Sequence, residues 1–183
     1  MSLKTEMTKP LLSPVLVTPP LEYPVTLEEA KTHLRVDSAE EDTLITALIA
    51  AAVGHMDGPT GVLGRCIMPQ TWSQEYETAC GDLVLPLAPV SSITSITDDF
   101  ADYRLLKDGR GYFLRLNDDA SWPTGAVVVE FAAGYSDVPD PLRSAMLLHI
   151  GTLFEHRETL AEGRMKPTWA YETLTAPYSV VGV

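Results

Sequence analysis

The fold is decided first by residues 25–34, which read Val-Thr-Leu-Glu-Glu-Ala-Lys-Thr-His-Leu. Thr26 and Glu29 have the spacing of a capping box, in which the hydroxyl and the carboxylate each satisfy a backbone amide that the first helical turn leaves free. Leucine and alanine then recur at helical spacing at positions 27, 30 and 34. The stretch therefore predicts a helix over residues 26–34.

Two further helices are predicted from caps and apolar spacing. Residues 39–57 begin with three acidic side chains, which suit the positive end of a helix macrodipole, and continue with a wide apolar stripe. Residues 141–160 follow Asp140 as a cap and begin with Pro141, whose missing amide hydrogen costs nothing at the first helical position. The second of these helices carries an apolar stripe of its own.

Residues 67–131 have the alternation and turn residues of short strands. A glycine-containing turn at residues 107–111 predicts a hairpin, because glycine tolerates positive φ. Five or six strands are expected in this region. The expected fold class is α+β, with the N-terminal helix pair and the long C-terminal helix forming a small bundle and with an inserted antiparallel β region.

The two ends of the chain differ from its middle. Residues 1–24 contain five prolines and are expected to form an extended arm, either free or lying on a neighbouring subunit. Residues 25–164 are expected to form one domain. Residues 165–183 are expected to form a separate C-terminal interaction segment.

The charge balance excludes several classes of function. The 183 residues carry 25 acidic and 13 basic side chains, for a formal net charge of −12. Proteins that grip nucleic acid or an anionic membrane usually cluster Lys and Arg, and no such cluster is present. Cys66 and Cys80 show neither disulfide nor zinc spacing, and no signal peptide or membrane-spanning run is visible. We expect a protein made in the cytoplasm with reduced thiols.

Candidate chemical motifs do not converge on an active site. Asp98, Asp99 and Asp102 have DDxxD spacing but lie between two predicted strands, so a solvated turn is expected. The four histidines form no metal-binding pattern, and the glycine-rich bend at residues 58–64 is not followed by the Lys-Ser/Thr of a P-loop. We expect no catalytic residue, no cofactor, no metal and no enzyme activity.

The order of several short motifs resembles the head–tail connector (adaptor) proteins of tailed bacteriophages and prophages. Departures are Phe154, where the family usually has tyrosine, and Asp57, where it often has glutamate; neither position is catalytic in that family. The resemblance spans roughly residues 21–180 and is carried by segments 24–37, 41–45, 60–61, 70–72, 85–90, 127–135, 138–139, 142–143, 155–158 and 176–178.

The resemblance implies a structural virion protein without enzymatic activity. Such proteins form a homo-oligomeric ring of about a dozen copies between the portal and the tail-side connector proteins. The resemblance also implies that DNA passes through the bore without specific binding and that the protein lies at the head–tail junction of the virion. Another virion ring component, such as a tail-completion or stopper protein, is the main alternative. A small metal-dependent hydrolase using Asp98, Asp99 and Asp102 is a remote one, which magnesium titration would test.

Two functional hypotheses follow from this implication. An acidic bore would repel phosphate and let DNA slide, so neutralising bore carboxylates is expected to slow ejection; unchanged ejection would reject the idea. Aromatic side chains after a helix-breaking Gly and Pro are typical of docking anchors, although folding back onto their own core would explain them equally well. The candidate interface residues are Trp169, Tyr171, Leu174 and Tyr178.

Overall fold

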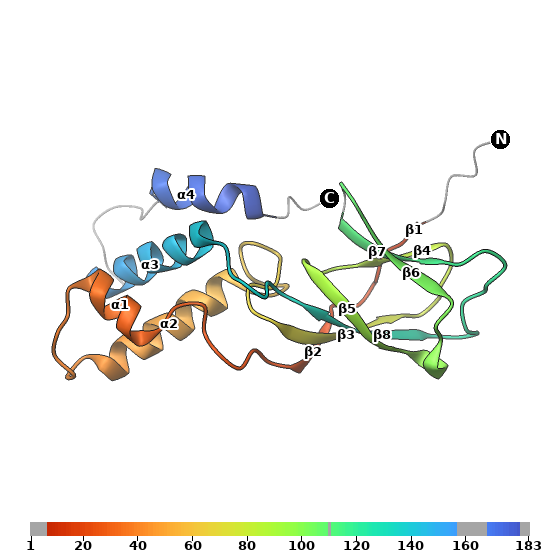
Figure 1. The fold of residues 1–183 in the computed structure, drawn as a ribbon, viewed down its shortest axis with the longest axis horizontal. Helices are drawn as coiled ribbons and strands as arrows, with labels where there is room; N and C mark the ends of the chain where they lie inside the picture. Colours follow the sequence, from red (N-terminus) through yellow and green to blue (C-terminus); the bar gives the residue numbers. More distant parts are fainter. Residues whose placement is uncertain (1–6, 110, 157–167, 180–183) are drawn as a thin grey trace. The chain divides into compact units, whose positions relative to one another are not determined.

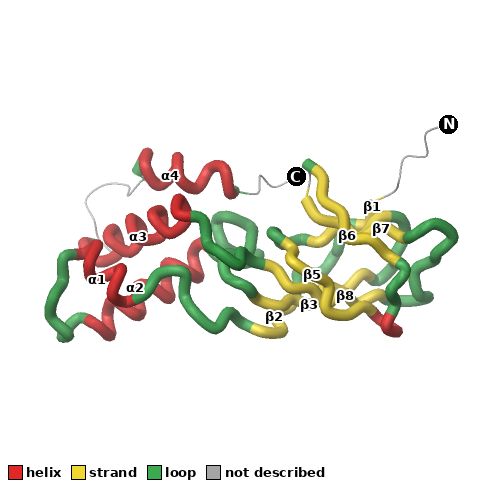
Figure 2. Tube along the Cα trace, viewed as in Figure 1, coloured by secondary structure: helices red, strands yellow, loops and turns green. Residues whose placement is uncertain are grey.

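The computed structural model describes residues 7–109, 111–156 and 168–179. The chain divides into two compact units. Residues 1–20 and 69–135 form the unit that we call the sheet unit, and residues 21–68 and 136–183 form the helical unit. The strands, yellow in Figure 2, all belong to the sheet unit, and the four α-helices belong to the helical unit.

The sheet unit contains two four-stranded sheets (Figure 1). One has the strand order β1-β4-β7-β6 and the other β2-β3-β8-β5. All neighbouring strands are antiparallel except β1 and β4, which are parallel. The strands are β1 (Met7–Thr8), β2 (Val15–Thr18), β3 (Gln70–Tyr76), β4 (Asp82–Leu85), β5 (Val90–Ile96), β6 (Tyr103–Asp108), β7 (Gly111–Leu116) and β8 (Val127–Ala133).

Alternating side chains of the two sheets form the core of the sheet unit. Along β8, every second residue is buried, and the same alternation occurs along β3. The Tyr76 hydroxyl donates a hydrogen bond of 2.6 Å to the Val84 carbonyl, which joins β3 to β4 of the other sheet. The Trp122 indole donates to the Gly81 carbonyl at 2.9 Å. These two buried polar groups are therefore satisfied within the unit.

One ion pair of the sheet unit involves a buried carboxylate. Asp82 at the start of β4 is only 2% exposed, and Arg115 of β7 reaches it with two hydrogen bonds. The Arg115 Nε–Asp82 Oδ1 distance is 2.9 Å, and Nη2–Oδ2 is 2.6 Å. This paired geometry gives both oxygens of the buried carboxylate a charge-assisted hydrogen bond.

The helical unit has a core formed chiefly by α2 and α3. Apolar residues of both helices are buried, among them Ile45, Ile49, Met146 and Ile150. Its elements are α1 (Leu27–Leu34), α2 (Asp42–Met56), α3 (Asp140–Glu155), α4 (Trp169–Thr175) and the 3₁₀ turn η2 (Ala176–Tyr178).

The predicted capping box is present at the start of α1. Thr26 Oγ1 accepts from the Glu29 amide at 3.2 Å, and the Glu29 carboxylate accepts from the Thr26 amide at 2.8 Å. The hydrogen bond from the Thr26 backbone lowers the pKa of Glu29, and Arg143 of α3 adds to this effect. Arg143 forms an ion pair with Glu29 and so joins α3 to α1.

The predicted architecture is wrong, although the chain is α+β. The prediction was a bundle of a helix pair and one long C-terminal helix with an inserted region of five or six strands. The described residues instead form eight strands in two sheets and four α-helices. The additional strands, β1 and β2, come from the proline-rich residues 1–24. Pro14 and Pro19 flank β2 instead of interrupting it, and edge strands tolerate nearby proline.

Some predicted segments lie outside the described residues. These are residues 1–6 of the expected arm, residues 157–160 of the third expected helix, and residues 165–167 and 180–183 of the expected C-terminal segment.

Candidate interface

The four aromatic and aliphatic residues predicted as interface candidates lie in or directly after α4. Thr168 caps this short helix, with its hydroxyl accepting from the Tyr171 amide at 3.3 Å. Trp169 in the first turn is 80% exposed, whereas Tyr171, Leu174 and Tyr178 are partly buried. The Trp169 side chain is therefore largely exposed to solvent, whereas the other three side chains are partly covered by their own unit.

Contacts within the helical unit account for the partly buried aromatic residues. The Tyr171 ring lies 5.9 Å from the His149 ring of α3, centroid to centroid. The Arg65 guanidinium lies 6.0 Å from the centroid of the Tyr178 ring. Both tyrosines therefore help to hold α4 and η2 against the unit. A docking role for all four residues stays a prediction, and Trp169 is the member that is free to dock.

Two histidines extend this aromatic cluster toward α2. The rings of His55 and His149 are stacked, with centroids 4.6 Å apart and an interplanar angle of 22°. Burial lowers the pKa of His149 below its ordinary value of 6.5, and the nearby His55 lowers it further. The stack is thus favoured when His149 is neutral.

This histidine stack is expected to make the stability of the helical unit sensitive to acid. The unfolded chain binds a proton at His149 more readily than the folded chain, so the free energy of unfolding is expected to fall as pH decreases below 6.5. Urea unfolding between about pH 7.5 and about pH 5 measures this slope. His149→Gln is expected to flatten the slope, while His33→Gln, at an exposed histidine of α1, is expected to retain it. Equal slopes in both variants would contradict the assignment.

A second candidate surface is the edge strand β2, which lies in the stretch predicted to be an extended arm. All four of its residues are exposed, including Val15 at 65%, Leu16 at 43% and Val17 at 48%. The Leu12 carbonyl before it accepts from the side-chain Nε2 of Gln74 at 3.0 Å. The signal for this surface was present in the sequence as an apolar run with no charged residue between Lys9 and Glu22.

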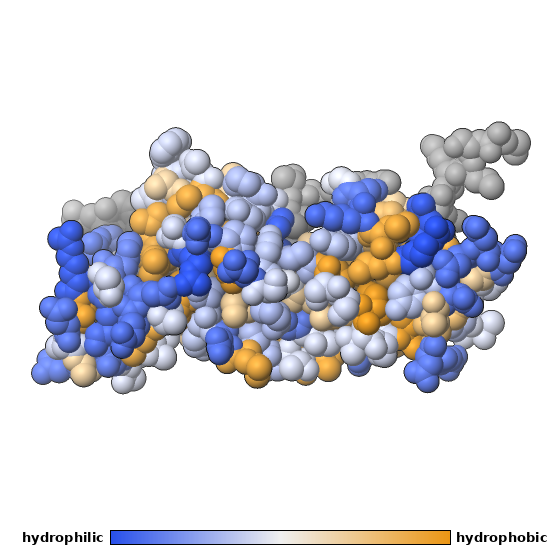
Figure 3. Space-filling view, viewed as in Figure 1, coloured by the Kyte–Doolittle hydropathy of each residue, from blue (hydrophilic) through white to orange (hydrophobic). Residues whose placement is uncertain are grey.

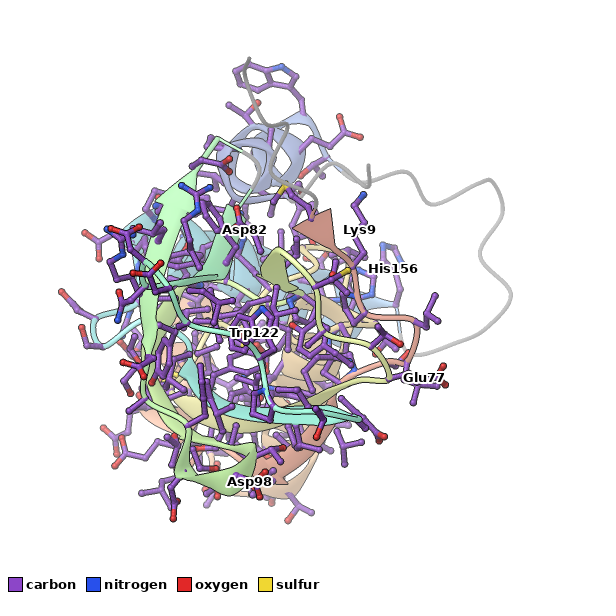
Figure 4. The ribbon with its side chains drawn as sticks, turned by 90° about the vertical axis from the view of Figure 1, so that its right-hand side faces the viewer. Lys9, Glu77, Asp82, Asp98, Trp122 and His156 are labelled. Atoms are coloured by element: carbon purple, nitrogen blue, oxygen red, sulfur yellow. The ribbon has the colours of Figure 1, made fainter. Side chains whose placement is uncertain are left out.

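The acidic residues with DDxxD spacing lie in the 3₁₀ turn η1 (Thr97–Asp99) and in the loop that follows it. Asp98, Asp99 and Asp102 are all exposed, and Asp98 and Asp99 have positive φ angles of 60° and 52°. Figure 4 shows Asp98 at the rim of the sheet unit, away from Asp82 and Trp122. Within the described residues, no group of three or more His, Cys, Asp or Glu side chains is placed to hold a metal ion.

The glycine-rich bend connects α2 to the segment before β3 through a compact loop. The Gly58 amide donates to the Arg65 carbonyl at 2.8 Å, and the Val62 amide donates to the His55 carbonyl at 2.9 Å. The Asp57 carboxylate accepts from the Ile67 amide at 2.6 Å. These hydrogen bonds pair the loop's polar groups with one another, as the prediction of a connecting loop requires.

In the part of the chain that the structure describes, no helix is long and apolar enough to span a bilayer.

Residues 24–80 match the family described as phage gp6-like head-tail connector protein. The resemblance to head–tail connector proteins is confirmed. The matching segment includes α1, α2, the glycine-rich bend and β3, and so covers parts of both units. No curated protein matches the chain.

Chains in solved structures of gene transfer agent (GTA) particles share the fold seen here. A chain in the neck of an empty GTA particle, computed with C6 symmetry, has a TM-score of 0.77 and 21% identity, covering 94% of this chain and 97% of that one. A chain from the virion of a native GTA particle has a TM-score of 0.73, with the same identity and coverage. A chain in the native neck, computed with C12 symmetry, has a TM-score of 0.64 and 20% identity, covering 92% and 97%.

Proposed function

We propose that this protein is a structural subunit of the neck of a tailed phage or phage-like particle, forming a homo-oligomeric ring between head and tail. The observation that carries the proposal is the combination of a connector-family match over residues 24–80 with a fold shared along nearly the whole chain with neck proteins. Proteins of that family and the structural neighbours are virion components. The ring would contact the portal on one side and tail-side connector proteins on the other.

The distribution of acidic residues supports passage of DNA through such a ring. The chain's net charge of −12 opposes binding to phosphate. Exposed aspartates are concentrated in two loops of the sheet unit, after β5 and after β7, at Asp98, Asp99, Asp118 and Asp119. Loops of this charge facing the bore would keep DNA from adhering to its wall.

The exposed Trp169 supports a docking contact with another neck component. Tryptophan is enriched among residues that dominate binding energy at interfaces, and this one contributes little buried area to its own unit. Tyr171, Leu174 and Tyr178 would hold α4 in place behind it. We infer that Trp169 is the anchor by which the ring joins the portal or the tail side.

Particle assembly in cells that carry the encoding genome tests the function. Removal of the chain is expected to yield DNA-filled heads that lack attached tails, and supplying the unsubstituted chain is expected to restore complete particles. Electron microscopy of the particles and an infectivity or transfer assay measure the result. Normal tailed particles in the absence of the chain would reject the proposal.

The same assay tests the role of Trp169. Trp169→Ala is expected to change the free energy of unfolding by less than about 0.5 kcal/mol, because the side chain is exposed, while reducing the yield of complete particles at least about tenfold. Thr173→Ala, at another exposed position of α4, serves as the control and is expected to leave the yield unchanged. A full yield with Trp169→Ala would exclude Trp169 as an anchor.

A further inference from the structure

Among the residues that the structure describes, the sheet with the order β2-β3-β8-β5 ends in two unpaired edges that lack charged residues. Edge strands of soluble proteins are usually protected by charged side chains, because unpaired backbone groups otherwise invite another strand. The free edge β6 of the other sheet follows this rule, since Arg104 and Lys107 are exposed and Asp108 is partly so. In contrast, residues 10–21, which include β2, and residues 83–97, which include β5, contain no charged residue.

An apolar row crosses this sheet from one free edge to the other. The pairing register places Leu16 beside Trp72, Trp72 beside Phe131, and Phe131 beside Ile93. The two middle residues are buried, whereas Leu16 is 43% exposed and Ile93 is partly exposed. At each edge of the sheet, the apolar row therefore ends in a side chain that is partly exposed to solvent. Hydrophobic atoms are also exposed over strands of the sheet unit on the face visible in Figure 3.

We propose that the β2 edge of one copy packs against the β5 edge of the next copy, so that the sheets of adjacent subunits lie edge to edge around the ring. The inference deepens the proposed function and rests on it. Ring closure by identical copies needs two different, mutually complementary surfaces on each copy, and two edges of one sheet provide such a pair.

Charge identifies a second copy as the partner. Two chains that each carry −12 repel one another over most of their surfaces, and contact is least opposed where acidic residues are absent. A basic partner would instead be drawn to the carboxylates that the chain has in excess. Uncharged, partly apolar edges thus favour self-association over binding of an oppositely charged protein.

The contact is expected to depend mainly on side chains and a few backbone hydrogen bonds. The register of β5 against β8 shifts at two places, and that of β2 against β3 shifts between Leu16 and Thr18. Such irregularities interrupt a continuous hydrogen-bonded ladder. The exposed apolar residues of β2 would therefore supply much of the contact with β5.

Two variants of the full chain separate the two edges. The first, Val15→Asp with Val17→Asp, charges only the β2 edge. The second, Ser92→Asp with Thr94→Asp, charges only the β5 edge, at two exposed positions. The control, Thr60→Asp with Val62→Asp, adds the same charge to exposed positions of the helical unit. Circular dichroism establishes that each variant is folded, and sedimentation velocity over a concentration series measures association of the 20.0 kDa chain.

A head-to-tail contact predicts a distinctive pattern for these proteins. The unsubstituted chain and the control are expected to associate beyond dimers as concentration rises. Each edge variant alone is expected to associate at least about 100-fold more weakly, because a carboxylate would have to be buried without a partner. An equal mixture of the two edge variants is expected to form dimers and nothing larger, because only one pair of intact edges remains.

Several outcomes would overturn the inference. They are an unsubstituted chain that stays monomeric throughout, an edge variant that associates as well as the control, or a mixture that contains no dimer. The proposed function is tested independently by the assembly of particles. A chain required for joining heads to tails whose edge variants associate normally would leave the neck function in place and exclude this interface.

Discussion

Replacement of Phe131 by alanine is expected to lower the free energy of unfolding of the sheet unit by about 3–5 kcal/mol. Phe131 is fully buried in β8, a strand that pairs with β3 on one side and with β5 on the other. Alanine would leave a cavity between Trp72 and Ile93 that neighbouring strands cannot close without breaking their pairing. Urea unfolding followed by tryptophan fluorescence measures the loss, because Trp72 and Trp122 are both buried in this unit.

Two matched variants control for the position and for the size of the change at Phe131. Phe131→Leu retains most of the volume and is expected to cost less than about 1.5 kcal/mol. Val128→Ala removes an apolar group from a partly exposed position of the same strand and is expected to cost less than Phe131→Ala. A loss for Phe131→Ala no greater than that for Val128→Ala would contradict the proposed core.

Gly61→Ala is expected to destabilise the helical unit by about 3 kcal/mol. A Cβ atom at this position would lie 2.6 Å from the Met56 carbonyl carbon and still closer to the Asp57 carbonyl oxygen. Both atoms belong to the backbone, so no change of side-chain rotamer can relieve the overlap. The loop would have to open, which would strain the hydrogen bond between the Val62 amide and the His55 carbonyl. Denaturation followed by far-ultraviolet circular dichroism measures the effect.

Gly54→Ala is the matched control for Gly61→Ala. Gly54 lies within α2, and a Cβ atom there would meet nothing within 4 Å. Since alanine is the better helix former, this substitution is expected to stabilise the same unit by about 1 kcal/mol. Replacement of glycine by alanine is thus expected to lower the free energy of unfolding at position 61 and to raise it at position 54. Effects of the same sign would show that the close approach at Gly61 does not restrict the loop.

Local signals in the sequence identified local structure well. The capping box at Thr26 and Glu29 is present as predicted, because its hydrogen bonds join residues only three positions apart. The pairing of β2 with β3 joins residues more than fifty positions apart, and no local pattern specifies it. Prolines made the N-terminal segment look unsuited to a sheet, although an edge strand between two prolines loses no ladder bond. The two-sheet arrangement therefore had to come from the structure.

The exposure of the candidate interface residues could be predicted only in part. Aromatic density singled out the segment around α4, but hydropathy could not distinguish Trp169, which is exposed, from Tyr171, which contacts His149. That distinction depends on the tertiary contact between α3 and α4. The β2 edge was missed because the absence of charge in residues 10–21 has no meaning until the strand is known to lie at the edge of a sheet.

Cryo-electron microscopy of the neck in particles that contain this chain tests the central claim most directly. The result we predict is a closed ring of identical copies between head and tail, with the two-sheet unit and the four-helix unit both visible in each copy. The account would be contradicted by necks that contain no density for this fold, or by particles in which the chain is found only outside the neck.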